Sequence, residues 1–430
     1  MKMRREKKVD VLVVGGGPAG IGAAISAARN GAHVLLAERY FFLGGMGTLS
    51  LVAGLYTQWS GERRILGGIV RELMDSLIRR GEAREICVPM SASPGVSSSR
   101  TEINPEAYKY LVEQRAVEAG VELLYGALFS DVRMEGDRVV GAVLETKSET
   151  WEVDARVVVD CTGDGDVAAF AGARFDKGER ESGTLQPISM LFLAGNVDVE
   201  RVFAFWASEE APRRLRAACA RGEIPMPSMA LHNPGWQRDI IVSMSRTACD
   251  ATDSLDLTRG QIAAREQIHR VFEFLKVNFP GFEHAYMVAS STQVGVRETR
   301  RIVGRYTLTR EDVIETRPFP DAIALGAYPI DIHRAEQNDV FFEQVARGDA
   351  YGVPYRCLVP ADVEGLLVAG RCVSATREAL GAIRVQLMCM AMGEAAGAAA
   401  ALCSREAVQP GSLDPALLRR ALRAQGAILD

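Results

Sequence analysis

The sequence lacks paired cysteines, metal-ligand clusters and long apolar runs. Its 8 cysteines are scattered without one C-x-x-C pair. This pattern fits neither a disulfide scaffold nor a zinc site, so we expect reduced thiols, no bound metal and a cytoplasmic protein. No apolar run reaches the roughly 18 residues of a membrane span, because even AMGEAAGAAAALC at 391–403 is mostly Ala and Gly.

An excess of positive charge is also missing. Lys and Arg number 50 and Asp and Glu 55, which gives a formal net charge of −5. This balance argues against a nucleic-acid groove or an anionic membrane surface, and it favours small molecules as partners. The basic start MKMRREKK precedes an apolar run shorter than the roughly 7–15 residues of a signal-peptide core, so we interpret it as a solvated leader.

A glycine-rich stretch opens the chain, VDVLVVGGGPAGIGAAISAARNGAHVLLAER at 9–39. It predicts a strand over 9–14, a helix over 18–30 and a second strand over 32–37. The turn has the spacing Gly15-x-Gly17-x-x-Gly20, and Glu38 follows the last glycine by 18 residues. These parts together predict a dinucleotide site, with the pyrophosphate at the helix N-terminus and the ribose on the carboxylate.

The rest of the chain predicts one nucleotide domain in two parts. Helix and strand signals at 105–118 and 121–125, a meander over 128–153 and a buried strand over 155–160 continue the first part. The middle carries more Pro, aromatic and charged residues and a helix over 259–279. A strand at 365–369 and a long helix from about 381 to 403 then return to the composition of the first part. We therefore predict an α/β protein with a Rossmann-type domain at 1–185 and 355–430, and an inserted α+β substrate or capping domain at 186–354.

Two features favour FAD over NAD. The chain returns to its first domain at the C-terminal end, whereas an NAD domain usually completes its own sheet. A second glycine pair, Gly44 and Gly45, follows Glu38 closely, which suits a loop pressed against a large cofactor. A plain glycine turn is the alternative interpretation of that pair.

Several ordered blocks resemble a known family. They are GGGPAG, Glu38, LGGMGT, INPEAYKYLVEQ, VVVDCTGDGDVAAFAGA, VGVRETRRIVGRYTLTREDV, GAYPIDIH and YRCLVPADVEGLLVAGRCVSATREALGAIRVQLMCMAMGEAAG. Together they resemble the FAD-dependent oxidoreductases of glutathione-reductase type, which are distantly similar to fumarate reductase flavoproteins and to the flavin subunit of heterodisulfide reductase. The resemblance covers nearly the whole chain and implies FAD. None of the 5 histidines lies in a block that suggests a covalent flavin link, so we expect non-covalent FAD.

The resemblance also implies which residues hold the cofactor. They are Gly15, Gly17, Pro18, Ala19 and Gly20 at the pyrophosphate; Glu38 and Arg39 at the adenosine; Gly44, Gly45, Met46, Gly47 and Thr48 on the pyrophosphate and flavin side; Phe129 at the adenine; Thr162, Gly163, Asp164 and Asp166 in the loop after the buried strand; Gly370 and Arg371 at the ribityl chain; and Ala382, Ile383, Arg384 and Val385 at the flavin. A helix start there would place its positive end near the flavin and stabilise the reduced form.

Two positions depart from the family pattern. Arg377 stands where many members carry His, and Arg371 stands where the wider class usually has an acidic residue. Either change can alter the substrate or the redox potential, so the resemblance does not carry over the activity of one particular member.

The catalytic candidates are His333, Arg297, Arg377 and Tyr355. His333 in YPIDIH is a candidate for proton transfer, with Asp331 two residues away; a structural histidine is the alternative. The arginines are candidates for a carboxylate clamp, and surface pairing with Glu is the alternative for each. A core role with a satisfied hydroxyl is the alternative for Tyr355.

We therefore predict an FAD-dependent oxidoreductase that moves two electrons to or from a small, carboxylate-bearing metabolite. One alternative is a non-catalytic or electron-transfer flavoprotein subunit that needs a redox partner. The other is an NAD(P)-only dehydrogenase. An external electron donor or acceptor is expected as a partner, and a homo-oligomer is expected from base rates alone.

Overall fold

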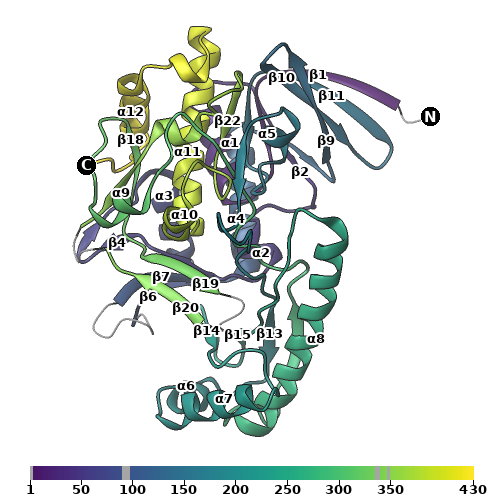
Figure 1. Ribbon diagram of the computed structural model, residues 1–430, viewed down its shortest axis with the longest axis vertical. Coiled ribbons are helices and arrows are strands. Elements are labelled where there is room, and N and C mark those ends of the chain that lie inside the picture. Colours follow the sequence, from purple (N-terminus) through teal and green to yellow (C-terminus); the bar gives the residue numbers. More distant parts are fainter. Residues whose placement is uncertain (1–2, 90–96, 335–338, 346–348) are drawn as a thin grey trace.

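A seven-stranded sheet with the order β8-β2-β1-β11-β10-β9, and β22 paired to β11, forms the centre of the larger part of the molecule (Figure 1). The computed structural model describes residues 3–89, 97–334, 339–345 and 349–430. The sheet strands are β1 Met3–Val14, β2 Val34–Glu38, β8 Glu122–Tyr125, β9 Leu128–Glu135, β10 Arg138–Glu145, β11 Glu149–Asp160 and β22 Leu366–Val368. β1 pairs in parallel with β2 and β11, whereas β9, β10 and β11 form an antiparallel meander.

Helices cover this sheet and include the C-terminal return of the chain. They are α1 Pro18–Arg29, α2 Met46–Leu49, α3 Gly68–Arg79, α4 Pro105–Glu118, α5 Asp166–Phe170, α9 Arg310–Ile314, α10 Arg377–Ile383, α11 Gln386–Glu406 and α12 Pro415–Ala424. The α/β fold predicted from the sequence is confirmed.

The closest packing lies between α1 and α11. A Cβ on Gly393 would collide with the backbone oxygen of Ala19, and one on Gly397 with that of Ala23. Only glycine permits this approach of the two helix backbones. The contact joins the N-terminal and C-terminal parts of the chain around one core.

Three predicted elements have different bounds. β1 begins at Met3, because its basic start pairs with β11 and Arg5 forms an ion pair with Glu149 at 2.6 Å. The basic run is therefore part of a strand and not a leader, although its first residues are exposed to solvent as expected. The meander strand and the buried strand predicted after it are one strand, β11. The single helix from about 381 is two helices, because Val385 is extended between α10 and α11.

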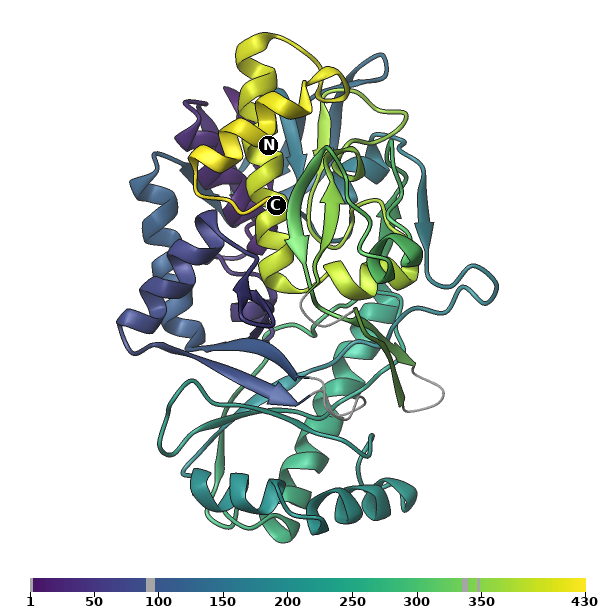
Figure 2. The same cartoon turned by 90° about the vertical axis from the view of Figure 1, so that its left-hand side faces the viewer.

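A second hydrophobic core lies in the lower part of the molecule (Figure 2). Its sheet has the order β14-β15-β13-β16. Its elements are β13 Leu191–Gly195, α6 Val199–Trp206, α7 Glu210–Ala220, β14 Ala230–His232, β15 Ile240–Ser243, α8 Ser254–Asn278 and β16 Tyr286–Ser290. This core runs from Ile188 to Val296, whereas the buried residues from Ile302 to Val353 belong to the first core. The segment predicted as 186–354 is thus divided between two cores.

Short strands complete the structure at the edges and between the two cores. They are β3 Gly54–Tyr56, β4 Trp59–Ser60, β5 Arg63–Arg64, β6 Ala83–Pro89, β7 Ser97–Ile103, β12 Phe175–Lys177, β17 Arg300–Ile302, β18 Ala322–Gly326, β19 Ile330–Arg334, β20 Asp339–Glu343 and β21 Tyr351–Pro354, with single 3₁₀ turns at Tyr355–Leu358 and Pro410–Ser412.

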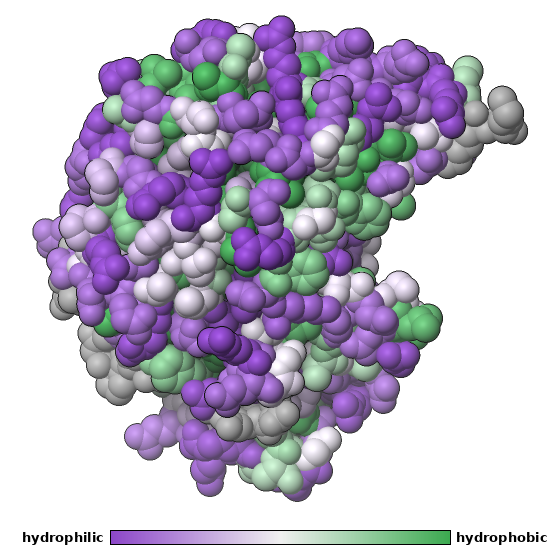
Figure 3. Space-filling view, turned by 45° about the horizontal axis from the view of Figure 1, so that its top comes forward, coloured by the Kyte–Doolittle hydropathy of each residue, from purple (hydrophilic) through white to green (hydrophobic). Residues whose placement is uncertain are grey.

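The helix α11 is long and apolar enough to cross a membrane, but 94% of its most apolar window is buried inside the protein. Small residues let it pack on α1, so its apolar character is that of a core helix. Hydrophilic residues cover most of the face in Figure 3.

The side chain of Glu394 on α11 caps the start of α3. Its Oε2 accepts a hydrogen bond of 3.0 Å from the backbone N–H of Ile69. Burial raises the pKa of Glu394 to about 8, so the carboxyl is protonated near neutral pH.

We predict that Glu394→Gln, which mimics the protonated acid, removes one pH dependence of stability. The folded state holds this proton up to about pH 8 while the unfolded chain loses it near 4.5, so the wild type loses stability as pH rises between these values. The slope is up to about 1.4 kcal/mol per pH unit. Thermal unfolding from pH 5 to pH 9 measures the effect. The difference between the Tm of Glu394→Gln and that of the wild type should change in favour of the variant up to about pH 8. Parallel Tm curves would contradict the raised pKa.

Candidate active site

A long cleft follows the carboxyl ends of β1, β2 and β11, where an open α/β sheet binds its ligand. Its walls come from the glycine turn, the end of β2, the loop before α2, the loop after β11, and the segment between β22 and α11. Segments far apart in the sequence therefore share one cavity.

The glycines of the first turn have separate roles. Gly15 has φ +100°, and a Cβ there would meet the backbone oxygen of Cys161. Gly20 lets α1 approach β1, because a Cβ would collide with the oxygen of Gly15. Gly17 has an ordinary φ of −72° and borders the cleft, with only the Cα of Gly45 within 4 Å of where a Cβ would stand. Glycine at position 17 is therefore required by the space that the cleft needs, and not by the conformation of the backbone.

Glu38 stands at the end of β2 beside the glycine turn. Its carboxylate accepts hydrogen bonds from the backbone N–H of Gly16 at 2.6 Å and of Tyr40 at 2.9 Å. Burial raises its pKa against these two hydrogen bonds. The carboxylate faces the cleft, in the position expected of a ribose acceptor.

The cleft brings together most of the residues predicted to hold FAD. Those that line it are Gly15, Gly17, Pro18, Ala19, Glu38, Arg39, Gly45, Met46, Phe129, Thr162, Gly163, Asp166, Gly370, Arg371 and Arg384. Two of the other predicted residues form hydrogen bonds next to the cleft. The Thr48 hydroxyl donates to the oxygen of Leu43 at 3.0 Å, and Asp164 accepts from Arg371 at 2.9 Å.

The predicted residues that do not line the cleft are Gly20, Gly44, Gly47, Thr48, Asp164, Ala382, Ile383 and Val385. Ala382 and Ile383 are buried in α10, and the helix that starts at the cleft is instead α11. Gln386, its first residue, lines the cleft and was missed by the sequence analysis because no local signal marks the break before it.

A second cavity of about 600 Å³ adjoins the cleft and extends toward the second core. Met46, Arg371, Arg384 and Gln386 line both spaces, so they mark the junction. A volume of this size suits a small organic molecule.

A cationic cluster lines this cavity near the junction. It contains Arg246, Arg297 and Arg384, with the carboxylate of Asp331 and the ring of His333. Asp331 Oδ2 accepts from Arg384 at 3.2 Å and from the hydroxyl of Tyr328 at 3.0 Å, and Oδ1 lies 3.2 Å from His333 Nε2. Burial acts to raise the pKa of Asp331, but His333 and Arg384 outweigh it and hold that pKa below its ordinary range.

His333 is a neutral base in this setting. Burial first, and then the charge of Arg297, lower its pKa to about 4. Nε2 lies 3.2 Å from Oδ1 of Asp331, and the lone pair of Nδ1 accepts a hydrogen bond of 3.2 Å from Nη2 of Arg246. The imidazole is therefore oriented and uncharged at neutral pH.

The other two catalytic candidates lie elsewhere. Arg377 does not line either space, and it pairs with Glu298 at 3.3 Å and with Glu179 at 3.5 Å. Tyr355 is buried in the first core, and its hydroxyl donates to the oxygen of Pro410 at 2.9 Å. In the described part of the chain, neither side chain reaches the cavity because its polar atoms are engaged elsewhere.

The unpartnered polar atoms at the junction fit FAD. Within the described structure, Nη1 of Arg371, Nε of Arg384 and Oε1 of Gln386 are buried without a hydrogen-bond partner. Two donors and one acceptor at the mouth of a dinucleotide cleft match the carbonyl oxygens, ring nitrogens and hydroxyls of a flavin and its ribityl chain.

A model of the family described as FAD dependent oxidoreductase matches residues 10–422. The chain belongs to this family. It is an enzyme, and its cofactor is FAD. Bound FAD supplies exchange of an electron pair with a substrate, while the protein supplies binding, orientation and electrostatics.

Curated relatives match only part of the chain. The chain is 33% identical over 177 residues to a thiamine thiazole synthase of Aeropyrum pernix, which covers 37% of this chain and 57% of that protein. It is 26% identical over 171 residues to that of Methanococcus vannielii, covering 36% and 56%. The chain thus spans little more than half the length of these relatives.

Solved structures match nearly the whole chain at low identity. A geranylgeranyl bacteriochlorophyll reductase-like protein from Thermoplasma acidophilum has a TM-score of 0.50 at 14% identity, covering 98% of this chain and 83% of that one. A triple mutant of a flavin-dependent brominase has a TM-score of 0.50 at 15% identity, covering 97% and 84%. These likenesses show the fold.

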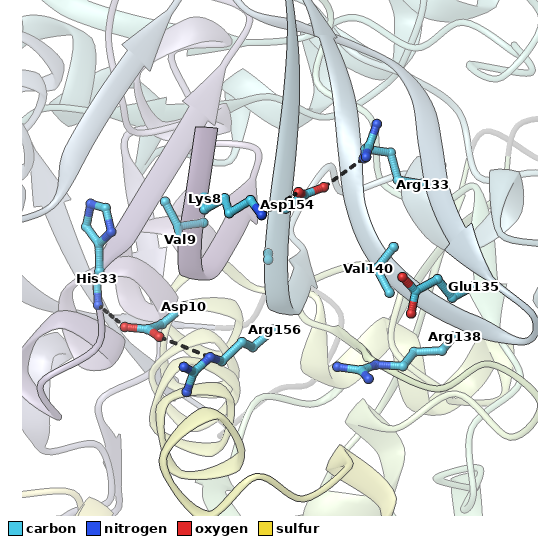
Figure 4. Close-up of a pocket in the computed structure, with 11 residues that line it drawn as sticks. Lys8, Val9, Asp10, His33, Arg133, Glu135, Arg138, Val140, Asp154 and Arg156 are labelled. Atoms are coloured by element: carbon cyan, nitrogen blue, oxygen red, sulfur yellow. Dashed lines mark hydrogen bonds and ion pairs between the residues drawn. The ribbon is translucent and has the colours of Figure 1, made fainter. Parts of the chain in front are cut away.

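A third hollow lies beside the middle of β1 and β11 (Figure 4). Several of its charged groups pair with one another: the Asp10 carboxylate accepts from the backbone N–H of His33 at 2.9 Å and lies 3.6 Å from Arg156, and Arg133 donates to Asp154 at 3.0 Å. It lies away from the carboxyl ends of the parallel strands, so the cleft at those ends is the better candidate for the ligand site.

We predict that Gly17→Ala weakens FAD binding about 10- to 100-fold without unfolding the protein. The backbone of Gly17 suits alanine, and the added methyl group would enter space that the cofactor needs, at a cost of about 1–3 kcal/mol. Fluorescence titration of the apoprotein with FAD measures the dissociation constant. The control is Gly31→Ala at the end of α1, where φ is +87° and no atom lies within 4 Å; it should lose stability and keep its affinity. The reverse pattern would contradict the assigned roles.

Proposed function

We propose that this enzyme oxidises or reduces a small carboxylate-bearing substrate bound in the second cavity, beside FAD. The observation that carries this proposal is the environment of Arg297. Its Nη1 donates to two neutral oxygens, the backbone oxygen of Pro187 at 2.6 Å and the hydroxyl of Ser189 at 2.9 Å. A half-buried guanidinium that lines a cavity and has neutral partners is a site for an anion.

The electrostatics around Arg297 support this interpretation. Burial, and then the nearby charge of Arg384, lower the pKa of Arg297 to about 9, and only Asp331 among the neighbouring carboxylates in the described part of the chain acts in the opposite direction. The charge of Asp331 offsets part of this effect, but its Oδ2 is already engaged by Arg384 and Tyr328. A substrate carboxylate would supply the missing negative charge, and the planar fork of Arg can bind it bidentately.

His333 is placed to move a proton for the same substrate. Its Nε2 lies 3.2 Å from the Asp331 carboxylate, and its Nδ1 accepts from Arg246, so Nδ1 becomes available as a base when a bound substrate takes over the hydrogen bond of Arg246. A neutral imidazole within reach of a bound substrate can accept a proton from a hydroxyl or amino group as the electron pair leaves. This arrangement favours oxidation next to the carboxylate.

The electron-transfer subunit is the second candidate. The cavity of about 600 Å³ at the junction favours turnover of a small molecule, because a subunit that only relays electrons has no need of one. Family membership with FAD as cofactor rules against the NAD(P)-only dehydrogenase. An external electron donor or acceptor, a homo-oligomer and a cytoplasmic location stay predictions from the sequence.

We predict that Arg297→Met weakens binding of a carboxylate substrate about 10- to 100-fold. The loss follows from one charged hydrogen-bonding partner, worth about 1.5–3 kcal/mol. The concentration of substrate that half-saturates anaerobic flavin bleaching measures the effect. Arg356→Met, which removes an arginine paired with Asp321 outside both cavities, is the control and should leave that concentration unchanged. Equal behaviour of the two variants would count against the anion site.

We predict that the acid limb of flavin reduction lies near pH 4, not near 6.5, because His333 stays neutral down to its lowered pKa. Above about pH 5.5 the protonation of His333 should therefore no longer change the rate. His333→Asn should lower the rate about 10²- to 10⁴-fold and abolish this limb. Stopped-flow reduction across pH tests this, with Tyr355→Phe as a control of unchanged profile. A limb near 6.5 in the wild type would refute the buried neutral base.

A further inference from the structure

We infer that the substrate is amphipathic, with its carboxylate at Arg297 and an apolar body that extends from the flavin junction to α6 in the second core. This inference rests on the proposed function and adds the chemical class of the substrate and its direction in the cavity. The juxtaposition that carries it is a cationic end beside FAD and an apolar end far from it within one cavity.

The far end of the cavity is built from apolar side chains. Phe203 and Trp206 are one helical turn apart on α6, and both are half-buried and line the cavity. Met226 and Met229 precede β14 and Leu231 lies within it, and all three are at most 9% exposed. Because Ala230 of β14 stands opposite Ser243 of β15, these side chains continue the apolar lining back toward the cationic end. Aromatic and methionine side chains form an adaptable surface for an apolar ligand.

The strands of the second sheet set the direction between the two ends. Arg297 bonds to Ser189, just before β13, and Arg246 follows shortly after β15. These two antiparallel strands run side by side from there, with Leu191 opposite Ser243 at the near end and Ala194 opposite Ile240 at the far end. The α6 helix begins soon after β13 ends. The apolar end is therefore one strand length from the cationic cluster.

The side wall between the ends is polar, and its two arginines share one carboxylate, whereas Nε of Arg100 and Nδ1 of His232 are buried without a hydrogen-bond partner in the described structure. Arg100 donates to Glu102 Oε1 at 2.5 Å, and Arg84 donates to Glu102 Oε2 at 3.1 Å. Arg100 also donates to the hydroxyl of Tyr56 at 3.0 Å. This wall can lie along an apolar body without requiring a second carboxylate on the substrate.

The test uses butanoate, hexanoate, octanoate and decanoate as probes, each titrated into the FAD-loaded enzyme while the flavin absorbance spectrum is recorded. Burial of a methylene group is worth about a three- to fourfold gain in affinity. We expect the dissociation constant to fall by about this factor for each added methylene until the apolar end is filled. A dissociation constant that does not change with chain length would overturn the inference.

Two variants locate the apolar body. Trp206→Ala and Phe203→Ala should each flatten the dependence on chain length while leaving butanoate affinity within about twofold; either variant suffices if the other fails to retain FAD. Phe205→Leu is the matched control on the same helix, because Phe205 packs against Phe279 instead of lining the cavity. An unchanged slope in both alanine variants would place the apolar body elsewhere and overturn the inference.

Arg297→Met separates the inference from the proposed function. It should weaken all four alkanoates by the same factor and keep the slope. If butanoate binds and responds to Arg297→Met but the slope is flat, the carboxylate site stands and the apolar end is wrong. If no alkanoate perturbs the flavin spectrum, or Arg297→Met changes none of the constants, the proposed function fails, and this inference with it.

Discussion

The contact between α1 and α11 is the constraint on which the rest of the structure depends. Gly393 and Gly397 let the backbone of α11 touch that of α1 at Ala19 and Ala23. This contact brings the C-terminal return of the chain against the glycine turn, so that one cleft has walls from both ends of the sequence. It also fixes the N-terminus of α11 at the junction with the second cavity, where its positive end would attract negative charge on a ligand.

Charge compensation links the two cavities. Arg371 and Arg384 line both spaces, but each is tied to an acidic residue, Asp164 and Asp331. Arg297 lies just beyond them with neutral oxygens as its partners. The protein thus carries positive charge with neutral partners beside the cofactor cleft. Together with burial this charge keeps His333 neutral, and it is the reason that we propose an anionic substrate.

Local signals made much of the cofactor cleft predictable from the sequence. Glycine spacing, a helix start at Pro18 and the acidic residue Glu38 report backbone geometry that few other residues permit. The cavity was less predictable, because Arg246 and Ser189 reach it only through the pairing of β13 with β15. Arg377 and Tyr355 carried the right chemistry in the right segment, but tertiary partners hold them outside the cavity; no pattern in one sequence reports such partners.

A crystal structure of the protein with FAD bound tests the central claim most directly. The account predicts that the isoalloxazine ring lies at the junction formed by Met46, Arg371, Arg384 and Gln386, with one face open to the cavity that holds Arg297. Electron density that places the ring elsewhere in the cleft, or that closes it off from Arg297, would contradict the account, because the carboxylate site and the reacting ring would then be separate.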